Sequence, residues 1–162
     1  MFEMVGVFKE AGQKIGNLIK GVNFMIQTEV VVGIPKDANT ARDGITNAEL
    51  MYIHENGSPA RNIPPRPALK LGLSDENTRN QIREMLLLGM RTALTGDVNK
   101  ARMYYEKAGM VGSSSVKKIF GQSPPLAPNA SSTIARKKSS KPLIDKGSLL
   151  SSITYAVRRK GS

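Results

Sequence analysis

The stretch SDENTRNQIREMLLLGMRTALTG, residues 74–96, decides the fold. Its apolar residues recur at the i, i+3, i+4, i+7 spacing of one face of an α-helix. Ser74 is a candidate N-cap, and Gly96 is a candidate left-handed residue that ends the helix. An isolated helix of this length is marginal in water, so the rest of the chain must cover its apolar face. That face consists of Ile82, Met85, Leu86, Gly89, Met90, Ala93 and Leu94.

The segments on either side predict further helices and a small sheet. Alternation with a period of two, which is typical of strands, runs through residues 23–34 and 149–159. We therefore expect an α+β protein in which a small antiparallel sheet packs against several helices, as a single domain over residues 1–162. Helical periodicity marks residues 2–20, residues 48–55 after a Thr46 or Asn47 cap, residues 98–109 after an Asp97 cap, and residues 116–120.

The net charge of +11 is unevenly distributed. Residues 1–80 carry equal numbers of acidic and basic side chains, so the whole positive excess lies in residues 81–162. This asymmetry favours a polyanion or an acidic protein as partner, and a tail that serves solubility is the competing interpretation. Tyr104 and Tyr105 have two interpretations as well: a platform for stacking bases, or half-buried core residues.

The chain contains no cysteine, which excludes disulfides, thiolate metal ligands and cysteine nucleophiles. Residues 1–4 lack the basic start and apolar run of a signal peptide. No apolar run approaches the roughly 18 residues of a membrane span. We expect a protein without cofactor, metal or membrane partner.

Residues 58–67, SPARNIPPRP, predict an extended arm because each proline fixes its own φ and biases the preceding residue away from helix. One interpretation is a stiff connector into the long helix. The other, which we favour, is a docking arm that contacts another subunit at little entropic cost, with Arg61 and Arg66 as polar anchors. On the second interpretation, Arg66→Ala spares the monomer and impairs assembly.

Residues 121–146 are rich in Ser, Pro, Ala and Lys, which predicts a long loop without a core of its own, ordered only when something binds it. Ser132 or Thr133 is a candidate start for a brief helical turn within it. Its basic residues are either solvated or in contact with phosphates. These residues are Arg136, Lys137, Lys138 and Lys141.

No catalytic constellation is recognisable in the sequence. The single histidine, His54, stands beside Glu55, but a zinc-binding helix needs a second histidine one turn away. Residues 145–148 invert the Gly-Lys-Ser order of a phosphate-binding loop. We therefore expect that the protein is not an enzyme. A muramidase or protease is a rival hypothesis that has only the His54–Glu55 pair behind it.

Three pieces of the chain resemble the tail-completion and virion-morphogenesis proteins of tailed bacteriophages, the group that includes minor tail protein Z-like and neck proteins. The helical middle of the chain matches that group in pattern only. Ala68 stands where an aromatic residue is common, and Lys146 where a threonine is usual. The matching pieces are NAELMYIHENGSP (47–59), NIPPRP (62–67), and the set PPLAP (124–128), TIARK (133–137) and PLIDKGSLLSSITY (142–155).

The resemblance implies a non-enzymatic virion protein, assembled in the host cytoplasm into a hexameric or dodecameric ring at the head–tail joint. Its partners would be tail-tube or tail-terminator proteins and head-connector proteins, with DNA passing through the ring. The competing hypothesis is a sequence-independent nucleic-acid-binding protein. The expected subunit-interface residues are Arg61, Ile63, Pro64, Pro65, Arg66, Pro67, Leu126, Pro142, Leu143, Ile144 and Asp145. The expected DNA-facing residues are Arg136, Lys137, Lys138, Lys141, Arg158 and Arg159.

Overall fold

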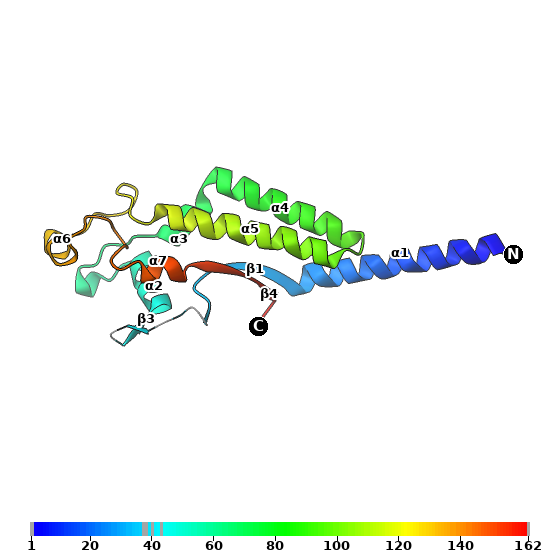
Figure 1. Cartoon of the computed structure of the whole chain (residues 1–162), viewed down its shortest axis with the longest axis horizontal. Helices are drawn as coiled ribbons and strands as arrows, with labels where there is room; N and C mark the ends of the chain where they lie inside the picture. Colours follow the sequence, from blue (N-terminus) through cyan, green and yellow to red (C-terminus); the bar gives the residue numbers. More distant parts are fainter. Residues whose placement is uncertain (1, 37–38, 40, 43, 162) are drawn as a thin grey trace. The chain divides into compact units, whose positions relative to one another are not determined.

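The chain folds into helices and a small antiparallel sheet, so the predicted α+β class is confirmed. The computed structural model describes residues 2–36, 39, 41–42 and 44–161 (Figure 1). The elements in chain order are α1 (Phe2–Gln27), β1 (Thr28–Gly33), β2 (Ala41–Arg42), β3 (Ile45–Thr46), α2 (Asn47–Asn56), the 3-10 turn Pro59–Arg61, α3 (Ala68–Ser74), α4 (Glu76–Leu94), α5 (Val98–Ile119), α6 (Ser131–Lys137), α7 (Ser148–Ser152) and β4 (Thr154–Arg159).

The backbone divides into two compact units, each assembled from segments that are distant in the sequence. Unit 1 contains Met1–Val31, Gln81–Gly109 and Ala156–Ser162. Unit 2 contains Val32–Asn80 and Met110–Tyr155. That residues 1–162 unfold together as a single domain stays a prediction.

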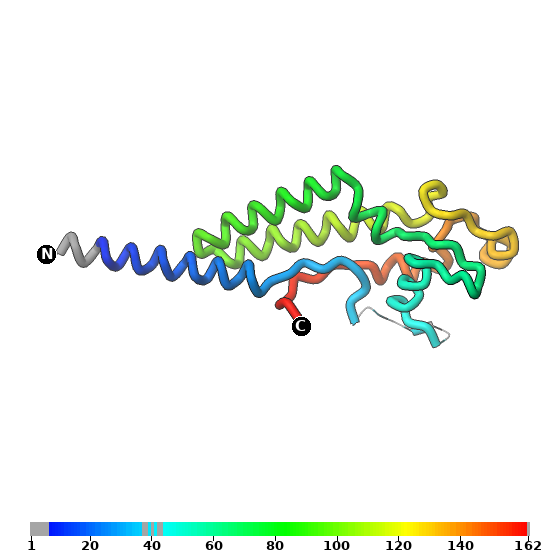
Figure 2. The backbone as a smooth tube through the Cα atoms, turned by 180° about the vertical axis from the view of Figure 1, so that it is seen from behind, coloured from blue at the N-terminus to red at the C-terminus, as the bar shows by residue number. Residues whose placement is uncertain are grey.

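The sheet pairs the strand that follows α1 with the last strand of the chain. β1 and β4 lie side by side, and beyond the strand ends the Lys160 N–H donates to the Gln27 carbonyl at 2.7 Å (Figures 1 and 2). β2 and β3 form a separate hairpin of two residue pairs. The strand predicted for residues 23–34 is therefore present only from Thr28 to Gly33, and the strand predicted for residues 149–159 begins only at Thr154, because Ser148–Ser152 form α7. Residues 23–27 continue α1 because the Phe24 ring packs on Tyr105, with ring centroids 5.1 Å apart.

Unit 1 is built around the antiparallel pair of α4 and α5, which run side by side in both views (Figures 1 and 2). Their close approach depends on Gly89, where an added Cβ would lie 2.7 Å from Cδ1 of Tyr105. Tyr105 is buried, as are Ala93, Ala101 and Ala108, so the interpretation of Tyr105 as a core residue is confirmed.

Several predicted helix boundaries are wrong. The helix expected from Ser74 begins at Glu76, and its cap is Asp75, whose Oδ2 accepts the Thr78 N–H at 2.8 Å. The segments predicted at 98–109 and 116–120 form one helix, α5, since Gly109 is buried inside it rather than ending it. The Asp97 cap is confirmed by its 2.9 Å bond from the Lys100 N–H. Among the described residues, no helix combines the length and apolar character that a bilayer span requires.

Unit 2 holds the larger apolar core. Helix α3 approaches α5 closely at Gly72, where an added Cβ would lie 2.6 Å from the Val116 Cα. The Ser115 hydroxyl ties the same two helices together by donating to the Gly72 carbonyl at 2.8 Å. The buried apolar residues of this core are Met51, Ala68, Val116, Phe120, Leu126, Leu143, Leu149 and Ile153.

The segment 121–146 contributes to that core, so the prediction of a loop without core residues is wrong. Leu126 is 2% exposed, and Pro142 and Leu143 are also buried. Leu143 has a φ of +61°, which costs roughly 1–2 kcal/mol for a residue with a Cβ. Burial of its side chain offsets that cost. The predicted helical turn near Ser132 is present as α6.

Candidate functional site

The candidate site lies in unit 2, where α2, the proline-rich segment and the segment 121–146 meet. Its foundation is the start of α2. The Thr46 N–H donates to Glu49 Oε2 at 2.8 Å, and the Glu49 N–H donates to the Thr46 hydroxyl at 3.3 Å, which together form a capping box. These hydrogen bonds from Thr46 lower the pKa of Glu49. The Thr46 cap predicted from the sequence is confirmed.

A tight turn follows α2 and gives the proline-rich segment a fixed shape. The Ser58 and Ile63 backbones bond to each other twice, with Ser58 N–H to Ile63 carbonyl at 2.9 Å and the reverse bond at 3.0 Å. Asn62 occupies the left-handed region at φ +52°, and its N–H donates to the Pro59 carbonyl. Residues 58–63 are thus a closed turn, whereas the sequence predicted an extended arm.

Arg66 fastens the proline-rich segment to the segment 121–146. Its Nε donates to the Ala127 carbonyl at 2.8 Å and its Nη2 donates to the Pro128 carbonyl at 2.7 Å. Its backbone N–H donates to the His54 carbonyl at 2.6 Å. The side chain is only 7% exposed, and burial lowers the pKa of its guanidinium. Arg66 therefore holds three parts of its own chain together.

His54 and Glu55 each have a role in the packing of their own chain. The Glu55 carboxylate accepts the N–H groups of Leu69 and Lys70 at 3.1 and 2.8 Å, and so caps the first turn of α3, where Pro67 supplies no side-chain cap. The pKa of His54 is lowered from 6.5 to about 4, chiefly by burial and further by the positive charges of Arg66 and Lys137. His54 is therefore a neutral, largely buried side chain at pH 7.

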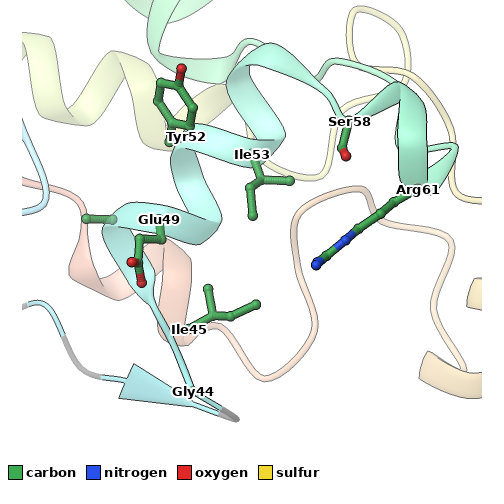
Figure 3. Close-up of a pocket in the computed structure, with 8 residues that line it drawn as sticks. Gly44, Ile45, Glu49, Tyr52, Ile53, Ser58 and Arg61 are labelled. Carbon is green, nitrogen blue, oxygen red and sulfur yellow. The ribbon is translucent and has the colours of Figure 1, made fainter.

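An open hollow of about 690 Å³ lies beside the turn formed by residues 58–63 (Figure 3). Ile45 and Ile53 supply apolar walls, Ser58 and Arg61 border it from the turn, and the exposed ring of Tyr52 stands at its rim. In Figure 3 the Arg61 side chain extends from the turn toward the space beside Ile53. Glu49 also lines the hollow but is engaged in the capping box. The lining thus combines apolar side chains with one cation, Arg61, and one anion, Glu49.

The expected interface residues separate into a buried and an exposed group. Arg66, Leu126, Pro142 and Leu143 are buried in unit 2, Ile63, Pro67 and Ile144 are half-buried, and Arg61, Pro64, Pro65 and Asp145 are exposed. Of these exposed residues, Arg61 lies in the turn 58–63, and Pro64 and Pro65 follow it directly. Interface contact stays a prediction for this exposed group, whereas the buried residues have contacts within their own unit.

The expected DNA-facing residues belong to two different units. Arg136, Lys138 and Lys141 are exposed on and after α6, and half-buried Lys137 donates from Nζ to the Lys141 carbonyl at 3.5 Å. Burial lowers the pKa of Lys137, while Asp145 opposes this shift. Arg158 and Arg159 belong to β4 in unit 1, where Arg158 Nε pairs with Glu29 Oε1 at 2.9 Å. Within the described part of the chain, no group of three potential metal ligands occurs.

Two features of the site escaped the sequence analysis. The hollow depends on Ile45, which carries no motif, and on Tyr52, which lies within the resemblance piece 47–59 but was given no role there. The second feature is the cap that Glu55 provides for α3, because the Leu69 N–H group that it accepts is 14 residues away in the sequence. Pro67 immediately before a helical run is the one signal that an N-terminus begins there.

Comparison of the chain with models of known protein families, with curated proteins and with solved structures gives no match.

Replacing Arg66 by Ala should destabilise the isolated protein, contrary to the expectation drawn from a free docking arm. Two hydrogen bonds from a charged donor are lost, and we expect the free energy of unfolding to fall by about 2–4 kcal/mol. Urea unfolding followed by circular dichroism measures the change. Arg61→Ala is the matched control, because Arg61 is exposed in the same segment and should change stability by less than about 0.5 kcal/mol. Equal stability of the two variants would contradict the role of Arg66.

His54 should make the protein less stable in mild acid. The folded protein resists protonation of His54 down to a pH of about 4, whereas the unfolded chain takes up the proton below 6.5. The contribution of neutral His54 to the free energy of unfolding is thus fully present above pH 6.5. It falls by roughly 3 kcal/mol as the pH falls toward 4. We expect His54→Gln to remove this component from the pH dependence of the unfolding free energy. Parallel pH profiles of the variant and the wild type would show that His54 titrates normally.

Proposed function

We propose that this chain is a structural subunit of a tailed-phage virion, a tail-completion or neck protein that forms a ring at the head–tail joint. The proposal rests first on the resemblance carried by residues 47–59, 62–67, 124–128, 133–137 and 142–155. In this role the protein joins parts and performs no chemistry. Its partners are copies of itself, the tail tube or tail terminator, and the head connector.

The observation that carries the proposal is the fixed proline-rich surface of unit 2. Arg61, Pro64 and Pro65 are exposed, yet the backbone that bears them is held by the Ser58–Ile63 bonds and by Arg66. A surface that is already ordered loses little conformational entropy when a partner docks. The adjoining hollow offers a receptor for a partner's side chain. Rings are built from such contacts between unlike surfaces of neighbouring subunits.

A second candidate function, sequence-independent binding of nucleic acid, is favoured by the exposed basic residues of α6 and the turn after it. Arg136, Lys138 and Lys141 face solvent in a chain of net charge +11. Such residues bind phosphates without reading bases. The two functions are compatible if genome DNA passes through the ring, because weak contacts of this kind do not obstruct its passage.

Loss of the protein from the phage that encodes it should leave DNA-filled heads and finished tails that do not join, as seen by negative-stain electron microscopy. The double variant Arg61→Ala, Pro64→Ala should give the same phenotype while its melting temperature stays within about 2 °C of wild type, since both positions are exposed. Lys70→Ala, an exposed change on α3 of the same unit, is the control and should join heads to tails. Joined, infectious particles in the absence of the protein would refute the proposal.

The triple variant Arg136→Gln, Lys138→Gln, Lys141→Gln should weaken binding to double-stranded DNA and flatten its salt dependence. Three lost phosphate contacts reduce the slope of log K against log salt by about 2–3. Fluorescence anisotropy with two unrelated duplexes measures slope and specificity together. Lys9→Gln, Lys20→Gln, Lys100→Gln carries the same charge change in unit 1 as a control. Equal losses in both variants would show a response to net charge alone.

A further inference from the structure

Helix α1 presents an apolar stripe to solvent. Phe8 is 70% exposed, Ile15 is 59% exposed and Ile26 is 64% exposed, and Leu18, Ile19 and Val22 are exposed beside them. In both backbone views the first half of α1 continues past the ends of α4 and α5, its partners in unit 1 (Figures 1 and 2). The stripe is therefore an unpartnered surface of unit 1.

The opposite face of α1 is the one that its own unit uses. The Asn17 side chain lies against Gly96, where an added Cβ would be 2.5 Å from the Asn17 Cγ. Gly21 lies against the Ala93 backbone, and Phe24 packs on Tyr105. At about 100° per residue, these positions lie roughly 150° around the helix from the centre of the stripe. Packing within unit 1 thus leaves the apolar stripe uncovered.

The spacing of the stripe is that of a helix that packs on another helix. Phe8, Ile15 and Val22 are seven residues apart, and Ala11, Leu18 and Met25 repeat the same spacing three positions later. These are the a and d positions of a heptad repeat, and the Ile19 and Ile26 positions widen the stripe. A repeat of seven is the pattern by which α-helices pack along their length.

Two glycines on the edge of the stripe have no explanation within the chain. A Cβ added at Gly12 or at Gly16 would meet nothing within 4 Å, so the fold of unit 1 does not require glycine at either position. Glycine inside a helix weakens it relative to alanine. Gly12 lies one turn from both Phe8 and Gly16, so the pair forms a flat surface against which another backbone can approach closely.

The area of the stripe and the glycines along its edge favour a protein as the partner. The exposed part of the stripe is on the order of 600 Å², close to the roughly 800 Å² per partner of a stable protein interface. The charges of α1 within residues 7–27 lie off the stripe, and Glu10 pairs with Lys14 at 2.7 Å. The apolar, glycine-edged stripe thus fits a second stripe of the same kind.

We propose that the stripe Phe8–Ile26 of α1 binds α1 of a second copy of this chain. This contact deepens the proposed function, because it rests on the assembly of like chains and names a surface for it in unit 1. It is separate from the proline-rich surface of unit 2.

The test measures molar mass and contact geometry. Light scattering after size exclusion should give wild-type masses that are multiples of 17.6 kDa at micromolar concentration. Ile15→Glu, Ile19→Glu should weaken self-association at least 100-fold. Gln13→Glu, Lys20→Gln is the matched control, since it makes the same charge change at exposed positions off the stripe and should leave the mass unchanged. Gly12→Ala, Gly16→Ala should raise the helix content of the monomer while weakening association at least tenfold.

Because the chain has no cysteine, single cysteines report the contact directly. Ile15→Cys should form a crosslinked dimer with a short bismaleimide, and Gln13→Cys should not. A monomeric wild type at 100 µM would overturn the inference, as would masses that the stripe variant leaves unchanged. Stripe-dependent binding of the monomer to phosphatidylglycerol vesicles would assign the stripe to lipid and overturn it too. If the protein forms oligomers whose mass does not depend on the stripe, the α1 contact is contradicted and the proposed function is not. If α1 pairs with α1 but heads and tails join without the protein, the proposed function is contradicted and the α1 contact is not.

Discussion

The bond between the Arg66 guanidinium and the carbonyls of Ala127 and Pro128 is the constraint on which unit 2 depends. A buried cation requires acceptors, and the chain supplies them from a segment more than 60 residues away. This bond fixes the proline-rich turn and the segment 121–146 at the same time. The neutral state of His54 comes chiefly from its own burial, and the positive charge of the nearby Arg66 lowers its pKa further.

Local signals in the sequence predicted local structure well. The Thr46 cap, the Asp97 cap and the left-handed Gly96 all depend on groups within a few residues of one another, and all three are present. The sequence did not predict that residues 98–119 form one helix. A glycine that packs inside a helix and a glycine that ends one cannot be told apart from the sequence alone. Only the neighbours of Gly109 distinguish the two cases.

The candidate site was predicted only in part, for a physical reason. Arg66 was recognised as an anchor, but its acceptors are backbone carbonyls, which every residue possesses and no sequence pattern marks. The segment 121–146 has the composition of a disordered loop, yet three well-placed apolar residues, Leu126, Pro142 and Leu143, are enough to bind it to the core. Composition averages over a segment, whereas packing depends on individual side chains. The hollow near Arg61 follows from the turn geometry and could not be read from any one stretch.

The division into two units has a consequence for how this chain can change. Both boundaries of unit 1 in the middle of the chain fall inside helices, at residues 80–81 of α4 and 109–110 of α5, and the outer ones fall inside β1 and β4. No linker separates the units, so neither corresponds to a continuous fragment that truncation can isolate. Recombination between related genes at a single crossover would therefore always split unit 1, and would also split unit 2 wherever the crossover falls within residues 32–155. Exchange of one intact unit would need several simultaneous crossovers, each in register with a helix or a strand.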